Sequence, residues 1–493
     1  IMSIKRYVAS KDNTITNAFK SSLILRGTGS NMGLSDVSEV FSIYGQQSTS
    51  SIEKSRILTE WDISTIQSDR DAGDIPASGS VNFFLNLYNA KHAGTLPRNF
   101  TLLIQPVSRS WDEGRGLDME EYSDLGYSNW IVASSSSSGL VNWTTQGGDY
   151  HTGPYVAGST LPSYSQNFKN GTENLSVDIT SLVEEWLDGT NDEARKNYGV
   201  GVFLTSSQEN GSEKQSFYTK KFFARGTEFF YKRPIIEARW DDSKKDNAGN
   251  FFLSSSLADA NDNLNTLFLY NFVRGQLKDI PSVGSGDILL SVYSTLGGDK
   301  ITLPVGSGVI SNNDVNVTGS RVEAGVYSAK FAYTGSATTI YPVWHNGTTE
   351  FFTGSAITVN TLSSFSYNPN PKYVSNITNL KPIYSTDENA RFRLHIRQKD
   401  WSPTIYTKAT SNIETEIIED AYYKVFRIVD ELDVIPYGTG SLNHTRLSYD
   451  VSGSYFDLDM GLFEPEYAYA FKFVYFVNGA YHEQKEIFKF RVE

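Results

Sequence analysis

The feature that most constrains this chain is an alternation of apolar and polar residues with a period of two, which recurs from end to end. Successive side chains of a β-strand point to opposite faces, so this period is typical of a sheet with one buried face. The clearest apolar faces are Val81, Phe83, Leu85 and Leu87; Tyr327, Ala329, Phe331 and Tyr333; and Phe488, Phe490 and Val492. The pattern predicts an all-β protein.

The run between residues 471 and 477 is less regular, because Val474 and Phe476 interrupt the alternation with apolar side chains. A nearly continuous apolar run of this length is typical of a strand that is buried on both faces. The composition agrees with a β fold, since 13% of the residues are aromatic and flat aromatic side chains favour pleated surfaces.

Only residues 178–189 carry the helical period. The apolar residues of that face are Ile179, Leu182, Val183 and Trp186. Ser181 and Glu184 have the spacing of a capping box, and Gly189 predicts the C-terminal end. We expect a short helix that lies across the edge of a sheet.

A chain of 493 residues is too long for one small core. Residues 240–249 are charged and rich in turn formers, and residues 363–372 contain two prolines that favour extended backbone. These segments predict three domains at 1–240, 241–365 and 366–493. We expect an N-terminal jelly-roll sandwich followed by two smaller immunoglobulin-like β-sandwiches.

Charge and cysteine content exclude several classes of function. The net charge of −13 disfavours a nucleic-acid partner, because an acidic surface repels phosphate. The absence of cysteine excludes disulfides, thiolate catalysis and cysteine-ligated metals. No apolar run is long enough for a membrane helix, and the first residues do not resemble a signal peptide, so we expect synthesis in a reducing cytoplasm.

The sequence predicts no cofactor. The six histidines are scattered without metal-ligand spacing. Residues 259–263 begin like an EF-hand loop, but Leu264 replaces the required glycine and Tyr270 stands where the bidentate glutamate belongs. We expect a polar turn there, and a structural calcium in the acidic loops is the only ion we consider.

Neighbouring carboxylates raise the hypothesis of a glycosidase. Asp112 and Glu113 follow a tryptophan, and Glu120 and Glu121 lie nearby. A chain with 56 acidic residues brings carboxylates together by chance, so we favour a solvated loop and assign no catalytic residue. The alternative is a capsule depolymerase that would lose activity when Asp112 or Glu113 is replaced by alanine.

Aromatic faces stack on sugar rings, and the N-terminal domain contains Trp61, Trp111, Trp130, Trp143 and Trp186. Trp61 and Trp186 fit strand and helix patterns, so we expect them in the core. Trp111, Trp130 and Trp143 are the candidate contacts for host surface polysaccharide. Exposure of these three rings in a concave patch would favour a glycan-binding protein, and their burial would count against it.

Residues 10–210 resemble the DNRLRE-type jelly roll, which is also classed as a domain similar to carbohydrate-binding module family 96. The matching segments, in order, are 12–16 (DNTIT), 30–34 (SNMGL), 55–62 (SRILTEWD), 81–88 (VNFFLNLY), 107–113 (VSRSWDE), 141–144 (VNWT), 177–186 (VDITSLVEEW) and 197–202 (NYGVGV). The resemblance implies a jelly-roll fold and an ancestral saccharide-binding role.

A second resemblance extends along the whole chain, to virion structural proteins of T4-like marine myophages such as cyanophages. It rests on segments 11–19 (KDNTITNAF), 26–33 (RGTGSNMG), 116–121 (GLDMEE), 263–267 (NLNTL) and 322–327 (VEAGVY). It implies a component of the virion but not its place in the particle. We expect a non-enzymatic structural protein that packs in several copies into the neck, tail or baseplate. The expected partners are other virion proteins and copies of itself.

Aromatic segments are the candidate assembly contacts, because Tyr and Phe give large contact area at low entropic cost. They lie in segments 413–423 and 222–231, and the residues that we select are Tyr422, Tyr423, Phe229, Phe230 and Tyr231. The alternative for both segments is an ordinary buried strand.

Overall fold

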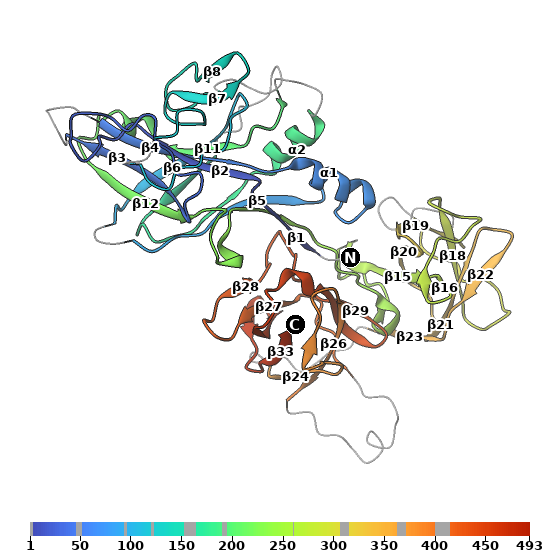
Figure 1. The fold of residues 1–493 in the computed structure, drawn as a ribbon. Coiled ribbons are helices and arrows are strands. Elements are labelled where there is room, and N and C mark those ends of the chain that lie inside the picture. The colour runs from blue at the N-terminus through green and yellow to red at the C-terminus, as the bar shows by residue number, and fades with distance from the viewer. Residues whose placement is uncertain are drawn as a thin grey trace. The chain divides into compact units, whose positions relative to one another are not determined.

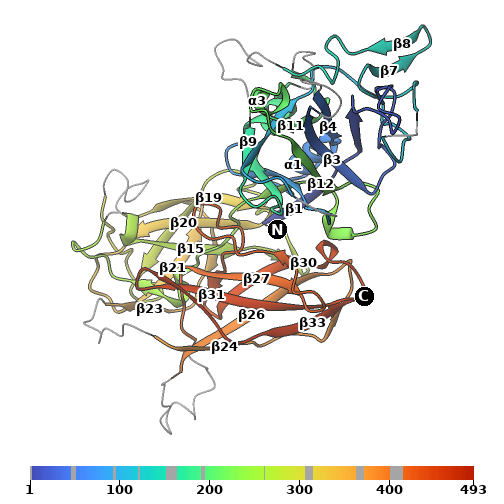
Figure 2. The same cartoon turned by 90° about the vertical axis from the view of Figure 1, so that its left-hand side faces the viewer.

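The computed structural model describes residues 3–45, 52–92, 96–119, 123–151, 164–189, 195–259, 261–305, 315–361, 371–399 and 415–493. The chain forms two compact units, Ile1–Asp241 and Asp242–Glu493 (Figures 1 and 2). Both units are built almost entirely of β-strands, which confirms the predicted all-β class.

Unit 1 is a jelly-roll-type sandwich of two antiparallel sheets. Its smaller sheet runs β1 (Ile4–Val8), β13 (Ile235–Arg239), β5 (Asn82–Leu87) and β10 (Leu175–Asp178). Its larger sheet runs β12 (Phe217–Phe223), β3 (Val37–Tyr44), β4 (Ile52–Glu60), β11 (Val200–Leu204), β6 (Phe100–Pro106) and β9 (Tyr164–Phe168), with β2 (Lys11–Thr16) also on β4. The first and last strands of the unit, β1 and β13, pair with each other and close it.

The main core of unit 1 lies between these sheets. The predicted face of β5 is buried throughout, and it packs with residues of the larger sheet such as Leu102 and Val202. Trp61 and Trp186 belong to the same core, as expected. Apolar residues at alternate positions therefore form both inner faces of the sandwich.

Two helices cover one end of this core. The predicted helix is α2 (Thr180–Asp188), and α1 (Ile63–Ala72) precedes it in the chain. The capping-box prediction is wrong, because Ile179 is the N-cap residue and Ser181 already lies inside the helix. The Asp178 carboxylate, just before the cap, accepts the Thr180 N–H at 2.9 Å. Glu184 instead forms a bidentate ion pair with Arg70 of α1, at 2.7 and 2.8 Å. Unit 1 also contains α3 (Ser206–Glu209), η2 (Phe230–Lys232) and a hairpin of β7 (Val132–Ser136) and β8 (Gly139–Asn142).

Unit 2 contains two β-sandwiches. In the first, the strands run β14 (Phe251–Phe252), β23 (Ile357–Asn360), β21 (Thr339–His345), β18 (Ile288–Tyr293), β19 (Val317–Glu323), β20 (Val326–Ala332) and β15 (Leu264–Tyr270), with β22 (Glu350–Thr353) also on β21. Strand β19 pairs with β18 through its first half and with β20 through its second half, so the sheet folds over the core. The predicted face of Tyr327, Ala329, Phe331 and Tyr333 is buried there.

The second sandwich of unit 2 has two sheets. One contains β24 (Tyr373–Ile377), β26 (Asn389–Gln398), β30 (Gly453–Asp459) and β29 (Ser448–Asp450). The other contains β25 (Ile383–Tyr384), β33 (Phe488–Val492), β31 (Ala468–Val477), β27 (Ala421–Arg427) and β28 (Asp433–Ile435), with β32 (Ala480–Glu483) on β31. Short elements complete unit 2, namely β16 (Phe272–Val273), β17 (Gln276–Leu277), η3 (Asn247–Gly249), η4 (Asn261–Asn263) and η5 (Met460–Leu462).

Stacked aromatic rings fill the core of this second sandwich. Phe392 and Phe456 are 5.0 Å apart between ring centroids, and Phe471 and Phe490 are 4.6 Å apart. The prediction that β31 is buried on both faces holds for Val474 but is wrong for Phe476, which is exposed. Phe476 lies near the end of the strand, where it contacts the ring of Tyr481 on the edge strand β32.

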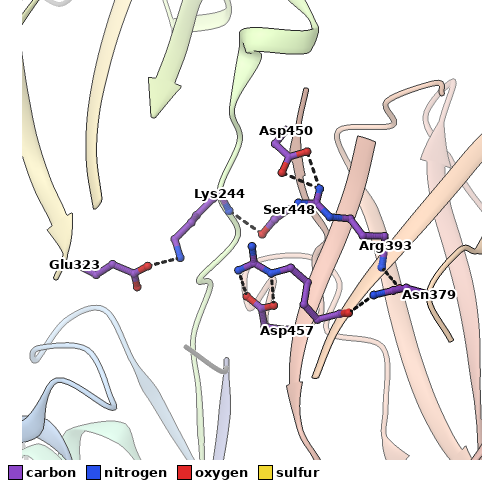
Figure 3. Close-up of polar contacts among 8 residues, drawn as sticks. Lys244, Glu323, Asn379, Arg393, Ser448, Asp450 and Asp457 are labelled. Atoms are coloured by element: carbon purple, nitrogen blue, oxygen red, sulfur yellow. Dashed lines mark hydrogen bonds and ion pairs between the residues drawn. The ribbon is translucent and has the colours of Figure 1, made fainter. Parts of the chain in front are cut away.

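A polar seam joins the two sandwiches of unit 2 (Figure 3). The Lys244 N–H donates to Ser448 of the second sandwich, and its ammonium binds Glu323 of the first at 2.7 Å. Arg393 binds Asp450 through two contacts of 2.7 Å on the same side of the seam. The segment around Lys244 lies alongside β29, where Lys245 and Tyr449 form an isolated parallel bridge.

Candidate functional site

The three tryptophans selected as glycan contacts lie in a second, smaller core of unit 1. Trp111, Trp130 and Trp143 are only 1%, 4% and 5% exposed, and they pack with Ile15, Leu58, Val107 and Ala133. The indole N–H of Trp111 donates to the Tyr198 carbonyl and that of Trp143 to the Asn129 carbonyl, both at 2.9 Å. None of the three rings is free to stack on a sugar, so the structure assigns them a packing role.

Buried asparagines fasten the loops that surround this small core. The Asn13 amide donates to Ser128 and its oxygen accepts the Met32 N–H, which ties β2 to two separate loops. Asn31 accepts the Gly116 N–H at 2.7 Å and donates to Asp124 at 2.9 Å. These bonds give Asn31, Met32 and Gly116 of the segments quoted above a structural role, since each provides part of a loop clamp.

Glycine is required where the two clamped loops meet. A Cβ on Gly114 would lie 2.1 Å from the Asn31 side-chain oxygen, and one on Gly116 would lie 1.9 Å from the Asn31 carbonyl oxygen. Both distances are far below van der Waals contact, so any side chain would force the loops apart. The loop end of unit 1 is therefore a close-packed, rigid surface.

Asp112 and Glu113, two of the acidic residues behind the glycosidase hypothesis, also hold loops together through hydrogen bonds and an ion pair. Glu113 binds the Arg225 guanidinium at 2.8 and 2.9 Å and accepts the Asp12 N–H. Asp112 accepts the Ser135 N–H at 3.0 Å. Glu120 and Glu121 lie outside the described residues.

Asp12 lies beside Glu113 and Arg225 and is a titratable group that the sequence analysis did not single out. Burial raises the pKa of its carboxyl to about 7, the Arg225 N–H that it accepts lowers it, and the nearby Glu113 raises it. A carboxyl with such a pKa resembles a general acid. However, Asp12 is only 2% exposed, so a substrate cannot reach it in this conformation.

Arg56 is a second buried charge that the alternation pattern did not reveal. Its guanidinium binds Glu209 at 2.5 and 3.0 Å and lies over the rings of Trp130, Tyr150 and Phe203. It also donates to the Gly147 carbonyl. This arginine links the small tryptophan core to β11 and α3, and it needs each of these acceptors because it is buried.

Exposed apolar side chains mark the surface of unit 1. Leu34 donates its backbone N–H to Gly116, so it lies beside Leu117, and Leu125 lies against Gly29. We call five exposed aliphatic residues in the loops of unit 1 the aliphatic rim, namely Ile24, Leu25, Leu34, Leu117 and Leu125. Apolar groups held in water by a rigid scaffold are typical of contact surfaces.

The aromatic contact segment of unit 1 is available to a partner only in part. Phe229 and Phe230 are 49% and 41% exposed, Tyr231 is half-buried, and Phe222 at the start of the segment is fully buried. The Lys232 ammonium lies over the rings of Phe223 and Phe229. Of the two exposed rings, Phe230 therefore belongs to η2 and Phe229 directly precedes it as the N-cap residue.

The contact residues selected in unit 2 are not at the surface. Tyr422 and Tyr423 on β27 are buried, and Tyr423 stacks on Phe456 with 4.4 Å between centroids. The Tyr422 hydroxyl donates to Asn443 of a loop that covers the outer side of β27. They cannot touch another subunit without leaving the core, so the alternative of an ordinary buried strand describes them. Residues 413 and 414 of that segment lie outside the described part of the chain.

The calcium-like segment borders a cavity in unit 2. Asn263 uses its amide oxygen and nitrogen to hold the backbone of Ser255 and Ala258, which is the role of a polar turn. Within the described residues no three His, Asp or Glu side chains gather as a metal site would require. Nor does any helix there have the length and apolar character to cross a membrane.

Comparisons with known proteins do not assign the chain to a family. No family model and no curated protein matches it. Among solved structures, a marsupial T cell receptor is 8% identical with a TM-score of 0.15, over 50% of this chain and 71% of the receptor chain. The chicken CNTN1 FN1-FN3 domains are 7% identical with a TM-score of 0.14, over 85% of this chain and 96% of theirs. Similarity this low carries no argument about function.

Proposed function

We propose that this protein is a non-enzymatic structural component of a bacteriophage particle, which packs in several copies into the neck, tail or baseplate. Its resemblance to virion proteins of T4-like marine myophages gave this expectation. A particle protein must remain folded outside the cell without chaperones, and in unit 1 the clamped loops of Asn13, Asn31 and Gly114 supply rigidity without disulfides.

The observation that carries the proposal is the pair of neighbouring exposed rings, Phe229 and Phe230. Two large aromatic side chains in water on a fixed turn cost solvation free energy, which contact with a partner would recover. Aromatic residues of this kind form the centres of protein interfaces. The aliphatic rim supplies a second apolar surface on the same unit.

The test is a phage, edited in its own genome, that carries Phe229→Ser and Phe230→Ser. We expect particles with much less of this chain, measured by quantitative mass spectrometry of purified virions, because the apolar contact is lost. The control is Leu257→Ser, which replaces a still more exposed apolar residue, 93% exposed, in unit 2. Unchanged incorporation of the double variant, or absence of the chain from wild-type particles, would contradict the proposal.

The alternative role is saccharide recognition, which is better supported in unit 2 than in unit 1. The buried Trp111, Trp130 and Trp143 do not support a glycan site on unit 1. A polar cavity in unit 2, lined in part by Phe252, has the features that such a site needs.

A further inference from the structure

Unit 2 contains a polar cavity of about 450 Å³, which lies within the usual size range of small-molecule sites. One wall comes from the first sandwich, from residues around η4 and β15, and the other comes from Lys245, Glu419 and Tyr449 beside the seam. We propose that this cavity binds one or two rings of a neutral saccharide. The proposal does not depend on the structural role proposed above.

The walls of the cavity are held in place before any ligand arrives. Asn265 pairs with both backbone groups of Phe252, at 2.9 and 2.8 Å, as a strand residue would. Asn247 accepts the Thr266 N–H at 2.9 Å and donates to the Tyr449 hydroxyl. These amides are committed to the walls, so a ligand meets a preorganised surface and little ordering entropy is lost on binding.

A second set of lining side chains is not held by hydrogen bonds of this kind. Asn261, Asp262, Lys330 and Glu419 are exposed, and within the described residues none of their side chains makes a hydrogen bond or ion pair. By contrast, Lys244 and Arg393 at the seam nearby are both paired. The cavity therefore gathers unpaired donors and acceptors in one place.

An aromatic surface accompanies these polar groups. Phe252 lines the cavity and remains 37% exposed, although its neighbour Phe251 is fully buried in the core. The C–H face of a sugar ring packs on a phenyl ring, and the hydroxyl groups at its edge both donate and accept hydrogen bonds. The phenyl ring of Phe252 can contact the C–H face of a sugar. The amide, carboxylate and ammonium groups of Asn261, Asp262, Glu419 and Lys330, which line the same cavity, can hydrogen-bond its hydroxyl groups.

The balance of charge selects a neutral ligand. Asp262 and Glu419 would repel phosphate, sulfate or a uronic acid. Lys330, together with Lys245, which pairs with Asp420 at 3.8 Å, would repel a metal cation. With two groups of each sign on the walls, an uncharged polyhydroxylated molecule meets partners for its hydroxyls and no net repulsion.

The experiment titrates the full-length protein by calorimetry with trisaccharides of glucose, galactose, mannose and N-acetylglucosamine, and with a glucuronic-acid disaccharide as the acidic arm. We expect a neutral member to bind. Phe252→Ala and, separately, Lys330→Met should each weaken that binding about tenfold, because each removes one recognition contact. Phe272→Ala is the matched control, since it truncates another exposed phenylalanine of the same sandwich outside the cavity.

Three results would overturn the proposal: no binding to any neutral member up to about 10 mM, binding to the acidic arm alone, or binding that both cavity variants leave unchanged. Both substituted side chains are at least partly exposed, and circular dichroism of each variant verifies that unit 2 remains folded. If Phe252→Ala loses binding and its circular dichroism spectrum also changes, the result for Lys330→Met decides the test.

Discussion

Individual buried charges determine much of the local stability of unit 1. Arg56 and Glu209 have side chains that are 14% and 7% exposed, and their ion pair lies against the small tryptophan core. A buried charge whose partner is removed still costs desolvation free energy but no longer gains the energy of the ion pair. Removal of one partner therefore destabilises the fold more than removal of both.

Arg56→Met should therefore lower the free energy of unfolding by roughly 3–5 kcal/mol, because Glu209 stays buried without its main partner. Arg56→Met with Glu209→Gln should recover part of that loss. Urea denaturation measures both variants. Arg391→Met is the control, since its pair with Asp457 is more exposed and should contribute less than about 1 kcal/mol. Equal losses at the two sites would show that Arg56 has no special role.

Asp12 gives unit 1 a predictable dependence on pH. Its folded-state pKa of about 7 lies above the ordinary value of 3.8, so between these values the folded state holds a proton that the unfolded state has released. Stability therefore falls as pH rises through this window. Asp12→Asn removes the titration and should raise the unfolding temperature at about pH 8 more than at about pH 5.

Thermal melts of the wild type and of Asp12→Asn at the two pH values measure this effect. Asp71→Asn, at an exposed position on α1, is the control for the loss of one negative charge. A difference in unfolding temperature that is the same at both pH values would contradict the assignment of the raised pKa to Asp12.

At the scale of elements, periodicity predicted the strands better than it predicted the ends of helices. The alternation at 81–87 and 327–333 identified buried faces, because a half-buried strand needs one apolar side. It missed α1, where only Ile66 is fully buried and Ile63 is partly buried against the core, too few apolar positions to show a helical period. The cap of α2 was misassigned because Asp178, Ser181 and Glu184 all fit capping patterns, and only tertiary contacts decide among them.

The candidate sites were harder to predict than the fold. Aromatic side chains serve both cores and binding surfaces, so the sequence could not distinguish the buried Trp130 and Tyr423 from the exposed Phe229. The cavity of unit 2 was not predicted, because Phe252, Lys330 and Glu419 are far apart in the chain. A clue was present in the polar segment 259–263, but its spacing pointed to calcium.

Asp178→Ala tests the cap of α2. The variant should lose about 1 kcal/mol of stability, because the Thr180 N–H loses its acceptor at the start of the helix. Ser181→Ala should cost less, since the Ser181 hydroxyl contacts Tyr164 rather than capping the helix. Denaturant titration of both variants gives the comparison, and a larger loss for Ser181→Ala would restore the capping box.

At the scale of the molecule, each unit has its own cores and closes its own sheets. Strands β1 and β13 close unit 1 before residue 241, and the segment around Lys244 already belongs to the seam of unit 2. Separate expression of residues 1–241 and 242–493 should therefore give two folded proteins. Their calorimetric transitions should together match those of the intact chain, and failure of either piece to fold would contradict this division.

Cryo-electron microscopy of intact purified particles tests whether the chain is a structural part of a phage particle. We expect ordered copies at the neck, tail or baseplate, with Phe229, Phe230 and the aliphatic rim buried against other subunits. Particles that lack density for the chain would contradict this role. So would copies in which these apolar surfaces all remain exposed to solvent.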